Sequence, residues 1–133
     1  MAKTTRFTIH RLSAMPFEVA WASESSWQPR VDVYQTDSAT LMHVEVPGVA
    51  QERLRLHLEN GRLVIEGERE QPPLPCPQHC LQVEITYGAF RRELPLPPDA
   101  DGNAIEAHYQ AGILQISIPR RKPQSQSVKV EIR

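Results

Sequence analysis

The sequence predicts an all-β fold in which two antiparallel sheets pack face to face as a sandwich. Large apolar residues recur at every second position through most of residues 31–118, which places them on one face of each strand. These segments are short and lie between turn residues, at the spacing that an all-β sandwich requires. Twelve prolines against six glycines also favour short strands and stiff loops over helices.

Four strands are expected in the first half of this region. Their alternating apolar residues are Val31 and Val33, then Met42, Val44 and Val46, then Leu54, Leu56 and Leu58, then Leu63 and Ile65. Pro47-Gly48 closes the second strand. Asn60-Gly61 joins the third to the fourth, and both residues suit the positive φ angles of a two-residue hairpin turn.

The alternation continues in the second half. The apolar sets are Leu81, Val83 and Ile85, then Phe90, Leu94 and Leu96, then Ile105, Ala107 and Tyr109, then Leu114, Ile116 and Ile118. A turn at Ala111-Gly112 precedes the last strand, and Pro119 ends it. Two facing sheets are expected to bury all of these residues and to leave the charged alternates outside.

The chain length of 133 residues favours one domain, with a tail at each end. We expect an apolar arm over residues 1–26, a β domain over 27–119 and a tail over 120–133. The arm has no steady period, and Pro16 would interrupt a helix. It either folds back over one sheet edge or serves as an adhesive, flexible arm for other proteins or subunits.

The C-terminal tail carries a detached apolar segment. Residues 120–127 hold no apolar side chain to bury, so they are expected to form a solvated, flexible linker. Val128, Val130 and Ile132 then alternate again. Because so short a strand is not stable alone, it needs a groove on its own domain or on a neighbour.

Sequence motifs of enzymes are missing. The chain has no GxSxG, HExxH or GxxxxGK pattern, so we expect no enzyme activity, no ATP-driven work and no cofactor. Cys76, His79 and Cys80 offer three metal ligands, but a closed zinc site needs four. Two ordinary thiols in a loop are favoured, while a redox-sensitive loop and a metal site remain alternatives.

The charge balance gives no attraction to nucleic acid or to acidic membranes. Fifteen basic residues face 16 acidic ones, for a net charge of −1. No stretch approaches the roughly 20 apolar residues of a membrane span, and the N-terminus lacks the apolar block of a secretory signal. We expect a cytoplasmic protein, in which cysteines remain thiols.

The loop that contains the cysteines is rich in proline. Pro73, Pro75 and Pro77 are spaced by two, so their missing amides would lie along one edge of an extended segment. The other edge would keep its donors and acceptors, which permits an edge strand that pairs on one side only. The alternative is a polyproline-type loop that pairs with nothing.

Several motifs, in the right order, resemble the small heat-shock proteins of the bacterial type, which are defined by the α-crystallin domain. The resemblance runs from about Trp27 to Pro119 and continues in the tail. The matching segments are Trp27-x-Pro29-x-Val31-Asp32-Val33, Val44-Glu45-Val46-Pro47-Gly48-Val49, Gly61 to Gly67, Glu84 with Tyr87-Gly88, Phe90, Arg92 and Leu96-Pro97, Ala107 with Gly112-Ile113-Leu114, and Val128-Lys129-Val130.

This resemblance implies an ATP-independent holding chaperone that captures partly unfolded proteins before they aggregate. It implies an immunoglobulin-like sandwich that dimerises and builds larger oligomers. It also implies that the segment from Leu74 to Gln78 of one subunit pairs, through Leu74, Cys76 and Gln78, with the first domain strand of another subunit. That strand contains Arg30, Val31, Asp32, Val33 and Tyr34, and Arg92 lies near it. Val128 and Val130 then stand as the oligomerisation hook. The residues that we expect to bind clients are Phe7, Ile9, Leu12, Phe17 and Trp21 of the arm.

The sequence offers two alternative functions. A β-sandwich adaptor, similar to co-chaperones of related fold, would have one fixed partner and no general client binding. The valine hook and the apolar arm argue against it, because such adaptors lack both. A redox- or metal-regulated protein is the other alternative, and it depends on Cys76 and Cys80.

Overall fold

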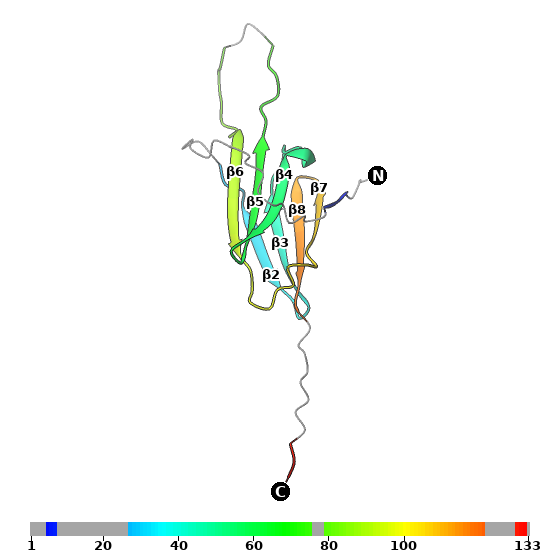
Figure 1. Ribbon diagram of the computed structural model, residues 1–133. Coiled ribbons are helices and arrows are strands. Elements are labelled where there is room, and N and C mark those ends of the chain that lie inside the picture. The colour runs from blue at the N-terminus through cyan, green and yellow to red at the C-terminus, as the bar shows by residue number, and fades with distance from the viewer. Residues whose placement is uncertain (1–4, 8–26, 76–78, 122–129, 133) are drawn as a thin grey trace.

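The chain folds as a β-sandwich of two antiparallel sheets (Figure 1). The computed structural model describes residues 5–7, 27–75, 79–121 and 130–132, with the backbone alone for residues 5–7. In these residues every long element is a strand, and a single 3-10 turn, η1 (Gln51–Arg53), is the only helical one. The all-β prediction and its two facing sheets are therefore confirmed.

The larger sheet has five strands in the order β1-β7-β8-β3-β2. Their bounds are Thr5–Phe7 for β1, Val31–Gln35 for β2, Ala39–Glu45 for β3, Glu106–Gln110 for β7 and Ile113–Pro119 for β8. The short strand β1 pairs with β7, so residues 5–7 of the arm extend one edge of the sheet. Sequence reasoning placed no strand there.

The smaller sheet has three strands in the order β4-β5-β6. Their bounds are Leu54–Glu59 for β4, Arg62–Arg69 for β5 and Gly88–Pro95 for β6. Asn60 and Gly61 join β4 to β5 with φ angles of 51° and 73°. This positive pair is the geometry of the predicted two-residue hairpin turn, which is confirmed.

The core lies between the sheets and is built from the alternating apolar residues. Met42 and Val44 of β3 face Leu63 and Ile65 of β5, and Phe90 of β6 is fully buried among them. Val64 lies between Leu63 and Ile65 in the strand and therefore on the opposite face of β5, and it is fully buried there. Apolar burial is the main stabilising contribution in such a core.

The turn at Pro47 and Gly48 is held by the β7–β8 hairpin. The Tyr109 hydroxyl lies 2.9 Å from the carbonyl oxygen of Val46 and 2.7 Å from that of Val49, and it donates to this pair. Burial raises the pKa of Tyr109. The Val46 amide donates to the Gly112 carbonyl at 2.8 Å, so both ends of this turn are fixed to the larger sheet.

One predicted strand is wrong. Residues 81–87 form no strand, and Leu81, Val83 and Ile85 are 96%, 69% and 61% exposed. The two limbs of the connection between β5 and β6, residues 70–75 and 79–87, instead project beyond the end of the sandwich (Figure 1). In the described part of the chain no strand lies beside the two limbs. The alternating apolar residues of the second limb are therefore not paired in a sheet of their own subunit.

Candidate functional site

The β2 edge of the larger sheet is one exposed apolar surface. Strand β2 pairs with β3 on one side, and among the described residues no strand lies on its other side. Val33 pairs with Met42, so it lies on the core face, yet it is 53% exposed. An unpaired edge with apolar side chains is a template for another strand.

The residues around β2 are anchored to the smaller sheet. Arg92 alternates with Phe90 and Leu94, so it lies on the face of β6 that is turned toward the larger sheet. Its Nη1 donates to Oε1 of Gln28 at 3.4 Å, just before β2 begins. The structure thus brings Arg92 to the β2 edge, where the predicted interface residues Arg30 to Tyr34 lie.

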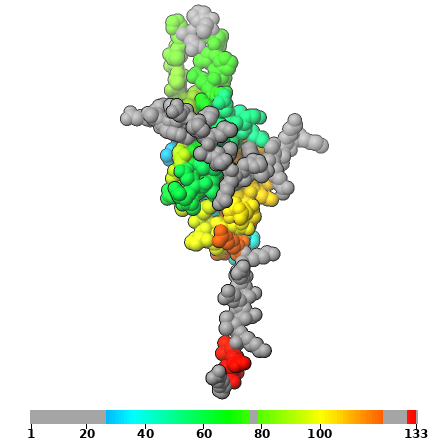
Figure 2. Space-filling view, viewed as in Figure 1, coloured from blue at the N-terminus to red at the C-terminus, as the bar shows by residue number. Residues whose placement is uncertain are grey.

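The limb of residues 79–87 is a second exposed apolar surface. Leu81, Val83 and Ile85 alternate with polar residues, and the limb stands clear of the sandwich (Figure 2). The other limb carries Leu74, which is 50% exposed. Cys76 and Gln78, also predicted at the interface, lie outside the described residues.

Sequence reasoning did not place Leu81, Val83 and Ile85 among the interface residues. A signal was present in the distribution of proline. Residues 72–77 contain four prolines, whereas residues 79–87 contain none, so every residue of that limb keeps its amide. A full set of amides together with strict alternation is what a pairing strand needs.

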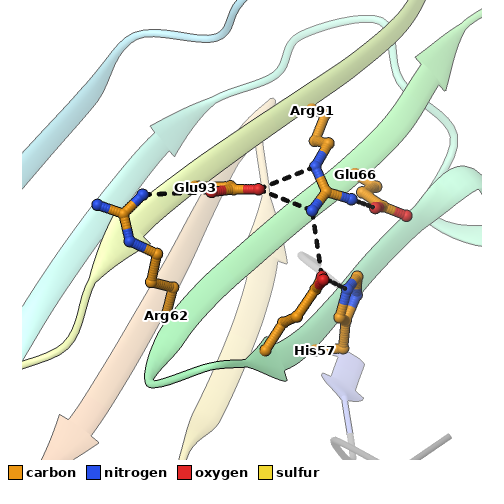
Figure 3. A network of polar contacts seen from close by, with 6 residues as sticks. His57, Arg62, Glu66, Arg91 and Glu93 are labelled. Atoms are coloured by element: carbon orange, nitrogen blue, oxygen red, sulfur yellow. Dashed lines mark hydrogen bonds and ion pairs between the residues drawn. The ribbon is translucent and has the colours of Figure 1, made fainter. Parts of the chain in front are cut away.

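A network of ion pairs covers the outer face of the smaller sheet (Figure 3). Arg91 lies at its centre, with contacts of 2.5 Å to Glu66, 2.7 Å to Glu93 and 3.1 Å to Glu59. The hydrogen bond from Arg91 lowers the pKa of both the Glu59 and the Glu93 carboxyl groups. Further contacts reach Arg62 and His57. The buried Val64 lies on the same face of the sheet, where its strand partners are His57 and Glu93.

This network makes stability depend on pH in a defined direction. The folded-state pKa values of Glu59 and Glu93 are lowered, so their contribution is present above the ordinary carboxyl pKa and is lost as pH falls through the folded values. We expect Arg91→Met to lower the urea midpoint at neutral pH and to have a smaller effect at roughly pH 3. Urea unfolding at both pH values measures this, and an equal effect at both would contradict it.

The start of the tail is held at the end of the sandwich opposite to the two limbs (Figure 1). Arg120 Nε lies 2.6 Å from Oδ2 of Asp99, and the Arg120 amide donates to the Ser38 carbonyl at 2.9 Å. Of the predicted hook, Val130 is 77% exposed and Val128 lies outside the described residues. Ile132 is 97% exposed. Apolar residues of the tail thus find no cover in the described part of their own subunit.

The predicted client-binding residues lie in the arm. Phe7 is the last residue of β1, where only its backbone is described. Ile9, Leu12, Phe17 and Trp21 lie outside the described residues.

The described residues offer no metal centre, because none of their His, Cys, Asp and Glu side chains form a group of three that could hold an ion. Cys80 is an exposed thiol, and Cys76 lies outside the described residues. In the same part of the chain, none of the helices is long and apolar enough to cross a membrane.

Comparison with known proteins identifies the family. The sequence matches the model of the Hsp20/alpha crystallin family over residues 32–133. Small heat shock protein C2 of Rickettsia felis is 32% identical over 117 residues, which cover 88% of this chain and 75% of that protein.

Solved structures agree with this match. HSP18.5 from E. histolytica has a TM-score of 0.65 and 34% identity, over 80% of this chain and all of that one. A small heat-shock protein from Xylella fastidiosa, which has a distinct high order structure, gives a TM-score of 0.70 and 30% identity, over 80% of this chain and 99% of its own. Small heat shock proteins are non-enzymatic chaperones of the stress response, and this chain belongs to their family, Hsp20/alpha crystallin.

Proposed function

We propose that the chain is an ATP-independent holding chaperone, which binds partly unfolded proteins and prevents their aggregation. In this proposal the arm over residues 1–26 binds clients, the domain over 27–119 forms dimers, and the tail over 120–133 joins dimers into larger oligomers. The clients and further copies of the chain are its partners in the cytoplasm. Membership of the small heat shock protein family supports this reading.

The single observation that carries the proposal is the number of exposed apolar surfaces on so small a domain. The β2 edge, the limb of residues 79–87 and the end of the tail each expose large apolar side chains, which are Val33, Leu81, Val83, Ile85, Val130 and Ile132. Exposed apolar patches of this kind mark sites where other chains bind. Each surface also has the alternation or the free edge of a strand, so pairing with a further chain is the expected mode of binding.

The dimer is proposed to form by exchange of a strand between two subunits. The limb of one subunit pairs with the free edge of β2 in the other, along Arg30 to Tyr34 and near Arg92. Leu81, Val83 and Ile85 then cover the exposed Val33. The assignment of Leu74, Cys76 and Gln78 to this contact stays a prediction, while the amides and the alternation of residues 81–85 favour this second limb as the pairing strand.

The hook of Val128 and Val130 is proposed to pack between the two sheets of a neighbouring subunit. Leu58 on the edge strand β4 is 39% exposed and offers apolar surface for it. Full burial of a valine contributes about 1.5 to 3 kcal/mol, so two contribute roughly 3 to 6 before ordering costs. Because millimolar affinity corresponds to about 4 kcal/mol, one hook binds reversibly and several together hold an oligomer.

We therefore expect Val128→Asp with Val130→Asp to reduce the oligomer to smaller units, because a charge cannot be buried in an apolar groove without a partner. Light scattering coupled to size exclusion measures the mass. The matched control is Gln124→Asp with Gln126→Asp, which adds the same charge to the linker and is expected to leave the mass unchanged. An unchanged mass in the valine variant would refute the hook.

The arm provides the test of client capture. Removal of residues 1–26 is expected to leave a folded β domain that protects a heat-labile enzyme poorly, because Phe7, Ile9, Leu12, Phe17 and Trp21 are gone. Circular dichroism checks the fold, and light scattering of the heated enzyme measures protection. Protection equal to that of the full chain would place the client-binding surface elsewhere.

A further inference from the structure

Arg69 lies where the chain leaves the sandwich for the first limb. It is the last residue of β5 and pairs with Gly88, the first residue of β6. Its Nε and Nη2 donate to the Thr86 carbonyl at 2.9 Å and 2.5 Å, and its Nη1 donates to the Pro47 carbonyl at 3.2 Å. One guanidinium thus joins the base of the second limb to the Pro47 turn.

Trp27 completes this cluster. The Arg69 guanidinium lies 4.0 Å from the centre of the Trp27 ring. The planar guanidinium of arginine stacks on an aromatic ring better than the ammonium group of lysine does. The Trp27 Nε1 donates to the Gly88 carbonyl at 3.0 Å, and its ring packs on the buried Phe90 with centroids 4.8 Å apart. We call Arg69, Trp27, Pro47, Thr86 and Gly88 the Arg69 clasp.

The clasp acts where backbone pairing has ended. The β5–β6 ladder stops at Arg69 and Gly88, and Gly88 has a φ angle of 114°, which turns the chain away from β6. Thr86 lies beyond the ladder, and the two contacts from Arg69 hold its carbonyl. Thr86 directly follows Ile85, the last apolar residue of the exposed set. Arg69 therefore bonds to the chain at the point where residues 81–85 join the sandwich.

We propose that Arg69 is a positioning residue for self-assembly: by linking the Thr86 carbonyl to the Pro47 carbonyl and to the Trp27 ring, it aims residues 81–85 at the β2 edge of a second copy. This inference rests on the proposed strand exchange. A limb that is already oriented loses less conformational freedom on binding, so the clasp strengthens association without touching the partner. Loss of the clasp releases the limb and weakens association while the sandwich remains folded.

Two variants of Arg69 test this inference in the full-length chain. Arg69→Ala removes all of its contacts. Arg69→Lys keeps the charge, but a single ammonium group lacks the planar fork that reaches Thr86 and Pro47 while it stacks on Trp27. The matched control is Arg53→Ala, because Arg53 lies near the same end of the sheet and its side chain forms ion pairs with Glu68 and Glu70.

Sedimentation velocity over a dilution series gives the concentration at which half of the chains are monomeric. We expect this concentration to rise at least about tenfold in Arg69→Ala and in Arg69→Lys, and to stay within about twofold in Arg53→Ala. Trp27 fluorescence, measured in a Trp21→Phe background, is expected to change in both Arg69 variants. Urea unfolding shows whether each variant is folded.

The outcomes separate this inference from the proposed function. A folded Arg69→Lys protein that dissociates at the same concentration as the wild type would overturn the role of Arg69, even where Arg69→Ala does not fold. A similar loss of association in Arg53→Ala would also overturn it, because the loss of one positive charge at that end of the sheet would then explain the weaker association without the contacts of Arg69. A wild-type chain that is monomeric at every concentration would instead refute the proposed strand exchange.

Discussion

Among the glycines of the described residues, Gly67 is the one whose replacement by alanine is expected to destabilise the sandwich most. A Cβ atom at this position would lie 2.6 Å from Cζ of Phe90 and 2.8 Å from the carbonyl oxygen of Arg53. Phe90 is fully buried and packs on Trp27, so its ring has no free space to move into. Overpacking of this kind typically costs about 1 to 3 kcal/mol and occasionally more.

This loss is large against the roughly 5 to 15 kcal/mol that stabilises a typical domain. Urea unfolding of Gly67→Ala measures it directly. Gly61→Ala is the matched control, because Gly61 has a φ angle of 73° but no atom within 4 Å of an added Cβ. The control carries backbone strain without a clash, so it is expected to lose less stability than Gly67→Ala. A Gly67→Ala protein as stable as the wild type would show that Phe90 repacks freely.

Replacement of Val83 by aspartate is expected to separate the dimer while each subunit stays folded. Val83 is 69% exposed in the single chain, so the change is nearly neutral for folding. In the proposed dimer the same position is buried against β2, where it loses about 1.5 to 3 kcal/mol of apolar burial and gains an unpaired charge. We expect association to weaken by about a hundredfold or more, which corresponds to roughly 2.7 kcal/mol.

Gln82→Asp is the matched control for this experiment. Gln82 lies on the same limb with its side chain on the opposite side, and it gains the same charge. Size exclusion with light scattering is expected to show smaller assemblies for Val83→Asp and unchanged assemblies for Gln82→Asp. Equal masses for Val83→Asp and the wild type would exclude residues 81–85 from the dimer contact.

The sequence predicted the sandwich because its core strands carry an unambiguous signal. Alternation placed Met42 and Val44 on one face, and Asn60-Gly61 defined a hairpin turn whose φ angles the structure confirms. The same alternation failed at Leu81, Val83 and Ile85. Periodicity shows that one face of a segment needs cover, but it does not show whether the same chain or another chain provides it.

Other features arise only from tertiary structure. Val64 lies on the outer face of β5, where alternation predicts a polar residue, yet it is fully buried between its strand partners His57 of β4 and Glu93 of β6. The Arg69 clasp likewise joins residues that are far apart in the sequence, such as Trp27 and Thr86. No local sequence pattern predicts the burial of Val64 or the contacts of Arg69.

A chain that holds unfolding proteins without ATP, as proposed here, must suppress aggregation in the absence of nucleotide. A purified heat-labile enzyme is heated with and without the full-length chain in a buffer that lacks nucleotide, and light scattering follows its aggregation. We expect scattering to fall as the chain approaches equal subunit concentration, and added ATP to change nothing. Undiminished scattering at a several-fold excess of chain, or protection that appears only with ATP, would refute the proposed holding activity.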